Sequence, residues 1–432
     1  MTSVSPRRRR EVIDALRRGT VPSQGLDLLA VGLDPFESAI ESELELIAGG
    51  GGVFKAVRGE YGSGKTFFSR HLAERALRRG FAAAEVQVSE TETPLHRLET
   101  VYRRITESLR TASVPPSAFR SVLDAWLFTL DDDATINEGS NVDQILAQRL
   151  ATVSSTMPAF AQVLRAYRSA TESGDAPRAE ALVAWLGGQP HVAAAAKRSA
   201  GIKGDLDHFG AMGALQGLLV VLRDAGHPGL LLVLDEVETL QRMRGDVRDK
   251  ALNALRQLID EIDAGRFPGL YLLITGTPAF FEGPSGLQRL PPLAQRLQVD
   301  FGTDRRFDNP RAVQIRLHGF DHAKLTELGR RVRDLYADGS QNQERIKSVV
   351  DDTYLSDLAD AVAGSLGGKI GIAPRIFLRK LVGDVLDRVD QFDDFDPRQH
   401  YALTLGEAEL NDVERNAVRS GQVRAGDIDL EL

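Results

Sequence analysis

The sequence predicts an α/β fold with a central parallel sheet, a large helical insertion and a C-terminal helical lid. Three observations predict it. Short apolar runs suited to buried strands alternate with amphipathic helical patterns, which is typical of βαβ units and hence of a parallel sheet. A glycine-rich loop separates the first apolar run from the helical pattern that follows it. Helical periodicity dominates two long stretches, about 100–205 and 311–390.

Hydrophobic periodicity and the positions of Gly and Pro predict the individual elements. After about Arg311 strand signals largely disappear, and the glycine run 49–52 is interpreted as a flexible turn. The predicted strands are 53–58, 82–88, 229–234 and 270–274, of which the last two are continuous apolar runs typical of strands buried on both faces. The predicted helices are 11–18, 35–48, 66–79, 209–225, 247–264, 322–336, 352–365 and 374–390.

The composition excludes several classes of protein. The chain has 432 residues, 42% hydrophobic and 26% charged, which is the balance of a soluble globular protein. No apolar run reaches the roughly 18 residues that a membrane span needs, so we expect a cytoplasmic protein. The absence of cysteine excludes disulfides, thiolate catalysis and Cys-ligated metal sites. A net charge of -8 argues against a surface built wholly for nucleic acid.

The glycine-rich loop fits the phosphate-binding pattern G-x-x-x-x-G-K-[ST] at every fixed position, and it lies between a predicted strand and a predicted helix. Its backbone N–H groups would face the phosphates of ATP, Lys65 would reach the β- and γ-phosphates, and the Thr66 hydroxyl would bind Mg²⁺. The predicted nucleotide-binding residues are Gly59, Glu60, Tyr61, Gly62, Ser63, Gly64, Lys65, Thr66 and Phe67.

Two acids end the third predicted strand, at the sheet edge where ligands of parallel α/β proteins bind. Asp235 would hold Mg²⁺, and Glu236 would polarise the attacking water. The alternative is that these acids simply terminate a strand in solvent. Ser89 and Glu90 follow another predicted strand, and they could face the nucleotide or belong to a structural turn.

These residues together resemble the AAA+ ATPase pattern. The resemblance implies that Thr275, or its neighbour Thr277, is the sensor 1 residue that contacts the γ-phosphate or the lytic water. Residues 371–375, Gly-Ile-Ala-Pro-Arg, are similar to the sensor 2 motif, which implies that Arg375 reaches the phosphates from a lid helix. The long insertion between the phosphate loop and Asp235 departs from the compact AAA+ arrangement.

An arginine finger is the third implied feature. Leu-Ala-Gln-Arg-Leu at 293–297 looks like the region that supplies such a finger across a subunit boundary, with Arg296 as the candidate and Arg289 as its rival. The alternative for Arg296 is a surface salt bridge. A working finger would require a homo-oligomer or a partner ATPase.

The chain also resembles a single family, the ATP-binding proteins of bacterial BREX phage-defence systems (BrxD), which are similar to origin-recognition-type AAA+ ATPases. Four segments suggest this: 10–22, 25–32, 54–62 and 89–104. The resemblance implies partners such as a helicase, a DNA methyltransferase or another defence ATPase. Charge and periodicity along the chain further predict a basic linker segment at 1–34, a nucleotide-binding core at 35–310, which the resemblance assigns to AAA+, a helical lid at 311–390 and an acidic segment at 391–432.

Two functions remain open on this basis. In the first, ATP hydrolysis drives the remodelling or loading of partner proteins on DNA. In the second, a nucleotide-gated scaffold binds ATP with negligible turnover and recruits a helicase, nuclease or methyltransferase. The arginines at 7–10 either contact nucleic acid or form the solvated face of a helix.

Overall fold

The computed structural model describes residues 4–136, 142–302, 304–366, 374–404, 406, 410 and 415. These residues form two compact units. The first unit contains the described residues of 1–37, 59–74 and 316–432, and the second contains those of 38–58 and 75–315. Within the described ranges, no helix combines the length and the apolar character that a membrane crossing requires.

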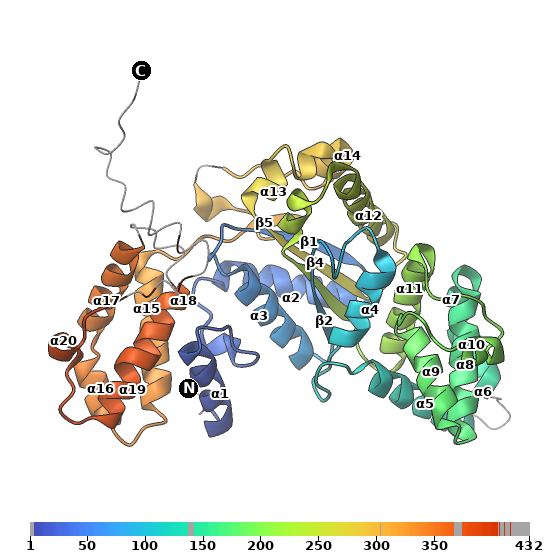
Figure 1. Ribbon diagram of the computed structural model, residues 1–432, viewed down its shortest axis with the longest axis horizontal. Coiled ribbons are helices and arrows are strands. Elements are labelled where there is room, and N and C mark those ends of the chain that lie inside the picture. Colours follow the sequence, from blue (N-terminus) through green and yellow to red (C-terminus); the bar gives the residue numbers. More distant parts are fainter. Residues whose placement is uncertain are drawn as a thin grey trace. The chain divides into compact units, whose positions relative to one another are not determined.

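The second unit is built on a five-stranded sheet with the order β2-β3-β4-β1-β5 (Figure 1). The pairs β1–β4, β2–β3 and β3–β4 are parallel, which confirms the predicted α/β class and parallel sheet. Four strands match the predicted ones within two residues at each end. The strands are β1 Val53–Arg58, β2 Ala82–Gln87, β3 Leu230–Asp235, β4 Leu270–Gly276 and β5 Gln314–Arg316.

The short strand β5 was not expected, because strand signals fade after about Arg311. It lies beside β1, where the Ala56 N–H donates to the Val313 carbonyl oxygen at 2.8 Å. Three residues are too few to produce an alternating pattern. Its buried polar residue, Gln314, donates from Nε2 to the Leu297 carbonyl oxygen at 2.7 Å. The strand is therefore fixed by tertiary contacts that the local sequence does not reveal.

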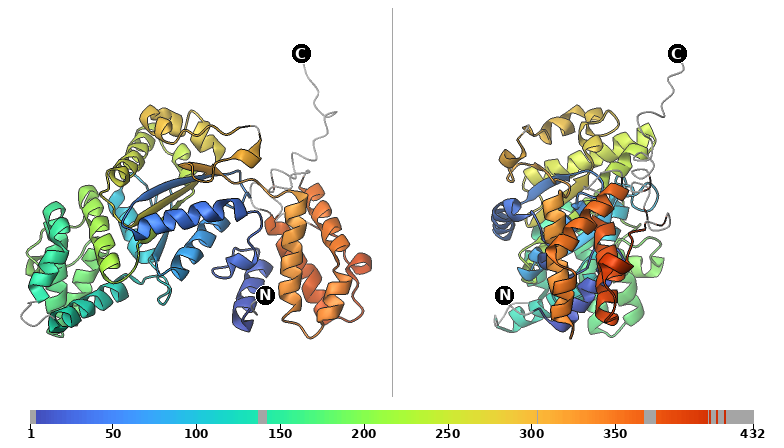
Figure 2. Two further views of the ribbon diagram at one scale, coloured as in Figure 1. Left: turned by 180° about the vertical axis from the view of Figure 1, so that it is seen from behind. Right: turned by 90° about the vertical axis from the view of Figure 1, so that its left-hand side faces the viewer.

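Helices cover both faces of the sheet (Figures 1 and 2). On one face, Leu232 and Leu272 belong to a hydrophobic core shared with α4 Leu98–Ser108, α11 His208–Asp224 and α12 Gly245–Asp263. On the other face, the Tyr271 hydroxyl donates to Glu43 of α2 Asp34–Ala48 at 2.5 Å. Glu43 also pairs with the buried Lys55 of β1. Because side chains alternate along a strand, residues 271, 273 and 275 of β4 all face the α2 side.

The predicted insertion consists mainly of helices in its described residues, and it packs into the same core as the sheet. Trp126 and Trp185 are buried there, as their apolar neighbours indicate. The helices are α5 Phe119–Ile136, α6 Val142–Arg149, α7 Ala151–Thr156, α8 Pro158–Glu172, α9 Ala176–Leu186 and α10 Ala194–Ser199. Between the insertion and β5 lie the short helices η2 Val237–Arg242, α13 Pro278–Glu282, η3 Leu287–Arg289, α14 Pro291–Arg296 and η4 Arg305–Phe307.

The first unit has its own hydrophobic core, to which the N-terminal helix and the C-terminal helices both contribute. Val12 and Leu16 pack there with Leu325 and Phe377. The N-terminal elements are α1 Pro6–Arg17 and η1 Leu26–Leu28. The C-terminal helices are α15 His322–Ala337, α16 Gln343–Val349, α17 Asp352–Ser365, α18 Pro374–Arg379, the π-helix η6 Lys380–Leu386, α19 Asp387–Gln391 and α20 Pro397–His400.

Candidate functional site

The carboxyl ends of β3 and β4 bring two polar side chains into direct contact. Asp235 ends β3 and is 6% exposed, and Thr275 near the end of β4 is fully buried. The Thr275 hydroxyl donates a hydrogen bond to Oδ1 of Asp235. Thr277, the alternative considered for this position, instead precedes α13. A buried carboxylate requires such donors, because burial without them is costly. The carboxyl ends of β3 and β4 thus carry a buried carboxylate that is hydrogen-bonded by a threonine hydroxyl.

Glu236 follows Asp235 in an unusual backbone conformation. Its φ of 60° and ψ of 44° lie in the left-handed region, which residues other than Gly, Asn and Asp rarely adopt. Its N–H is shared between Oδ1 of Asp235 and Oγ1 of Thr275, at 3.2 Å each. These bonds hold the turn while the Glu236 side chain stays exposed. Strained residues of this kind cluster at functional sites.

Gln87 is the residue that sequence reasoning missed. It ends β2 opposite Asp235 in the parallel register, and its Nε2 donates to Oε2 of Glu236 at 3.0 Å. A polar residue at the end of a strand that borders β3 was the available signal, but the strand order is needed to recognise it. The other candidate beyond β2, Ser89, accepts from the N–H groups of Glu92 and Thr93 and so stabilises its own turn.

The predicted phosphate loop begins directly after β1 and ends in α3 Lys65–Arg78. Gly62 and Gly64 have φ of 79° and 90°, which glycine adopts at no steric cost. At Gly59 the available space matters instead, since a methyl group there would lie too close to Oγ of Ser63, which would have to rotate away. The loop therefore has the tight, glycine-dependent form that lets backbone N–H groups approach a phosphate.

Two buried polar groups of the loop fit a bound polyphosphate. Lys65 is 8% exposed, and its Nζ donates to the carbonyl oxygens of Gly59 at 2.9 Å and Glu60 at 3.3 Å. It also lies 5.2 Å from the centre of the Tyr61 ring. Oγ of Ser63 is buried without a hydrogen-bond partner in the described chain. Such orphan groups are rare in proteins, and a phosphate oxygen beside this hydroxyl would supply the missing partner.

The family comparison agrees with this loop. The model of the BREX system ATP-binding protein BrxC/D family matches residues 4–405. This chain belongs to that family. It is accordingly an ATP-binding protein of a BREX system, and the resemblance noted in the sequence is confirmed for BrxC/D as a whole. A comparison with curated proteins found no match.

The sensor 2 candidate of this BrxC/D protein is only partly described. Gly371, Ile372 and Ala373 lie outside the described residues, and Arg375 lies in the first turn of α18. A methyl group built at Gly19 would lie 3.5 Å from Nη1 of Arg375, so this guanidinium lies beside the segment that follows α1. Phe67 packs against the same helical core of the first unit. The start of the phosphate-loop helix thus packs against the core that the N-terminal and C-terminal helices share.

Both arginine-finger candidates form ion pairs with acids of α12. Arg296 lies 2.9 Å from Asp260 and 2.8 Å from Asp263, and Arg289 contacts both oxygens of Asp249 at 2.8 and 3.0 Å. The Arg289 guanidinium lowers the pKa of Asp249. Exposed ion pairs of this type contribute little to stability, so an arginine can leave one for another partner at small cost. The arrangement fits the salt-bridge alternative, and a role across a subunit boundary stays a prediction.

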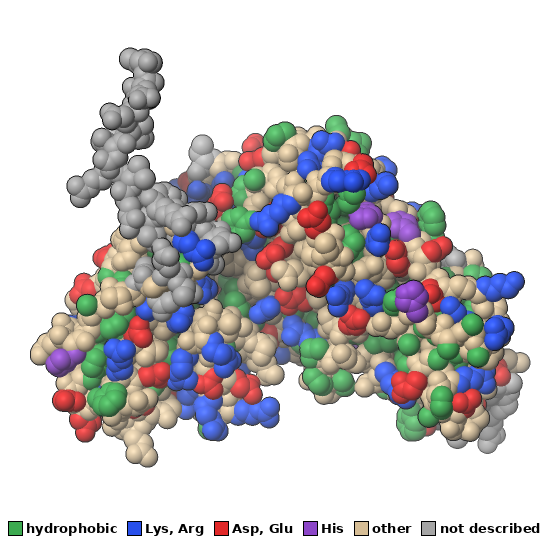
Figure 3. All heavy atoms as spheres, viewed as in Figure 1, with side chains coloured by type: hydrophobic (Ala, Val, Ile, Leu, Met, Phe, Trp, Pro, Cys, Tyr) green, Lys and Arg blue, Asp and Glu red, His purple; other side chains and the backbone are tan. Residues whose placement is uncertain are grey.

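The N-terminal arginines do not form one solvated cluster. Arg8 pairs with Asp27 and with Glu74 of α3, and Glu74 also accepts the N–H groups of Gly25 and Leu26 at 3.0 and 2.8 Å. Arg7 is exposed and pairs with a neighbouring acid on its own helix. Basic and acidic side chains are mixed over the face of the molecule in Figure 3. At least Arg8 therefore has a structural role.

Proposed function

We propose that this BrxC/D protein is an AAA+ ATPase that hydrolyses ATP to ADP and phosphate and uses the cycle to remodel or load partner proteins on DNA. The observation that carries the proposal is the hydrogen-bonded group at the end of the sheet. Asp235 is buried and bound by Thr275, and Glu236 is held in a left-handed turn with its carboxylate directed outward. A scaffold that only binds nucleotide has no need for this arrangement.

In the proposed reaction, the loop from Gly59 to Thr66 binds the phosphates through backbone N–H groups, and Lys65 exchanges its bonds to the loop carbonyls for phosphate oxygens. Oγ of Ser63 gains a partner in the same step. Thr66 and Asp235 are the proposed ligands of Mg²⁺, which supplies charge neutralisation at the β- and γ-phosphates when it is bound.

Glu236 is the proposed residue that orients and polarises the attacking water. Its carboxylate accepts from Gln87, and this bond fixes one oxygen while leaving the other for water. Thr275 positions Asp235 and the Glu236 backbone, and Arg375 is the proposed contact to the γ-phosphate from the C-terminal helices. Preorganised groups of this kind contribute most of the catalysis in phosphoryl transfer.

The wider parts of the proposal rest on the BREX membership. The proposed partners are other proteins of the system, such as a helicase, a methyltransferase or an ATPase, and DNA and self-association are further candidates. The AAA+ core at 35–310, the lid at 311–390, the flanking segments 1–34 and 391–432, and a cytoplasmic location belong to the same proposal. Arg296 would act in such an assembly by exchanging its intramolecular pairs for a neighbour's nucleotide.

Steady-state phosphate release tests hydrolysis against nucleotide-gated scaffolding. Glu236→Gln should keep wild-type ATP affinity and lose about 100-fold or more in turnover, since a positioned base contributes this much. Glu99→Gln, an isosteric change on α4, is the matched control and should leave both unchanged. The assay is run with the protein alone, with DNA and with the BREX partners. Equal and negligible turnover of wild type and Glu236→Gln under all conditions, with ATP bound by both, would favour the scaffold.

A further inference from the structure

The second unit has a pocket of about 550 Å³ at the edge of the sheet opposite Asp235 and Thr275. Pro228 and Pro268 line it, and they lie just before β3 and β4 begin. Ala48 at the end of α2 and Val220 of α11 complete its apolar wall. The pocket thus touches the amino ends of the same two strands whose carboxyl ends carry the candidate catalytic residues.

Most of the charged and titratable groups in the pocket are already engaged. Asp224 accepts from Arg149 of the insertion through Oδ1 and from the Trp126 indole through Oδ2, the latter at 2.7 Å. The Nδ1 atom of His227 lies 2.7 Å from the Gly80 carbonyl oxygen. The remaining group is Arg223, whose guanidinium forms no hydrogen bond or ion pair with the described residues. Its positive charge is therefore available to a ligand.

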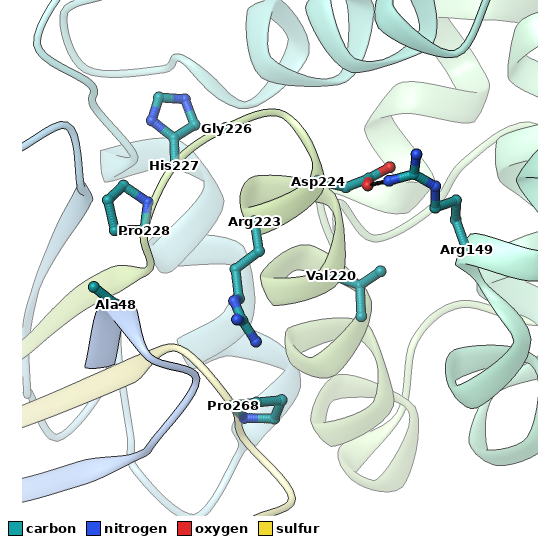
Figure 4. Close-up of a pocket in the computed structure, with 9 residues that line it drawn as sticks. All are labelled: Ala48, Arg149, Val220, Arg223, Asp224, Gly226, His227, Pro228 and Pro268. Atoms are coloured by element: carbon teal, nitrogen blue, oxygen red, sulfur yellow. Dashed lines mark hydrogen bonds and ion pairs between the residues drawn. The ribbon is translucent and has the colours of Figure 1, made fainter. Parts of the chain in front are cut away.

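Two glycines make room for Arg223 in this pocket. A methyl group at Gly50 would lie 3.1 Å from Nη2 of Arg223, and one at Gly269 would lie 2.7 Å from its Cδ. Both glycines have left-handed backbones, with φ of 92° and 86°. The glycine run 49–52 is therefore more than a flexible turn, because one of its members makes room for the guanidinium. Figure 4 shows Arg223 extending from α11 toward Pro268, whereas Arg149 turns to Asp224.

We propose that this pocket binds a carboxylate attached to an apolar body, with the carboxylate on Arg223 and the apolar part against Pro228, Pro268 and Ala48. A planar guanidinium fork matches a carboxylate with two parallel hydrogen bonds. The volume lies within the range of ordinary ligand pockets. The ligand is either a free organic acid or an acidic side chain flanked by apolar residues in a partner protein.

The surroundings favour a carboxylate over a phosphate. The helices α2 and α11 end at Ala48 and Asp224, so the partial negative charge of two helix C-termini is directed at the pocket. The two C-termini repel any anion, a phosphate dianion more strongly than a carboxylate, so a single free guanidinium in this field can attract at most one negative charge. A phosphate dianion would need further donors, and the only other arginine of the pocket is paired with Asp224.

Calorimetric titration of the full chain tests the proposal with two acids and their neutral counterparts. The probes are hexanoate with hexanamide, and the peptide acetyl-Leu-Glu-Leu-amide with its Gln analogue. At least one acid should bind about tenfold more tightly than its neutral counterpart, because only the acid pairs with the guanidinium. Tighter binding of hexanoate would identify a free organic acid as the ligand, and tighter binding of the peptide would identify an acidic partner segment.

Three variants assign the binding to Arg223. Arg223→Gln should lose the preference for the acid, and Arg223→Lys should retain part of it because a point charge remains without the fork. Arg198→Gln, which changes another exposed arginine in the last turn of a helix, should bind as wild type. Lys65→Ala should also bind as wild type, which separates this pocket from the phosphate loop. Equal affinity for acid and neutral probe, failure of both acids to bind at millimolar concentration, or unchanged binding by Arg223→Gln would overturn the proposal.

Discussion

The two ends of β3 and β4 differ in how their polar groups are satisfied. At the carboxyl ends, Asp235 and Thr275 are buried and bonded to each other, and even the Glu236 N–H has two acceptors. At the amino ends, an exposed pocket contains Arg223 with no partner among the described residues. We propose that the first arrangement serves chemistry and the second the capture of a ligand. One pair of strands therefore links two sites that can be tested separately.

The largest effect is expected on ATP affinity, for a substitution in the phosphate loop. Lys65→Ala removes a buried ammonium from the phosphate loop, and the loss of charge-assisted bonds should weaken ATP binding by about 100-fold, or about 2.7 kcal/mol. Fluorescent ATP titration measures it. Arg198→Gln, a change of another cationic residue far along the chain, is the control. Wild-type ATP affinity of the Lys65→Ala protein would contradict the assignment of the loop.

Gly59→Ala should come next in size. The added methyl group would lie too close to Oγ of Ser63, so that hydroxyl must rotate out of the position proposed to meet phosphate, or the loop must shift. We expect ATP affinity to fall by about tenfold, which corresponds to about 1.4 kcal/mol. Gly364→Ala is the matched control, since Gly364, like Gly59, has no left-handed backbone and no atom lies within 4 Å of its added methyl group. If Gly59→Ala binds ATP as wild type does, the close approach has no functional meaning.

The sequence was enough to predict the phosphate loop, the two acids and four strands, because each produces a pattern within one short continuous segment. A glycine motif following an apolar run, or acids ending one, needs no knowledge of the fold. Gln87 could not be found in this way, because only the parallel register places it opposite Asp235. The Arg223 pocket is harder still to predict from the sequence, because Gly50, Arg223 and Gly269 come from distant parts of the chain. Strand β5 likewise depends on contacts made only in the folded chain.

A smaller effect is expected at Gln87. Gln87→Leu removes one hydrogen bond to a carboxylate. Such bonds contribute about 1.5–3 kcal/mol net and less where the carboxylate is exposed to solvent, as that of Glu236 is, so turnover should change by about tenfold or less. Phosphate release at saturating ATP measures this, and ATP affinity should stay at the wild-type value. A loss as large as that of Glu236→Gln would instead make Gln87 part of the reacting group.

The smallest effect should come from the amino end of the strands. Arg223→Gln should leave both ATP affinity and unstimulated phosphate release unchanged, because its guanidinium lies at the opposite sheet edge from Asp235. The same two assays serve here. A substantial change in either would mean that the two ends of β3 and β4 are coupled even without a ligand in the pocket.

Hydrolysis of bound ATP in a single turnover, compared between Thr275→Ser and Thr275→Val, tests the central claim most directly. Serine keeps the hydroxyl that donates to Asp235, whereas valine has nearly the same shape without it. Valine should also lower the free energy of unfolding by about 1–3 kcal/mol, since buried Asp235 loses its donor. We predict that Thr275→Ser hydrolyses ATP at close to the wild-type rate and that Thr275→Val is slower by about tenfold or more. Equal rates for valine and wild type, with both proteins folded and ATP bound, would contradict the account.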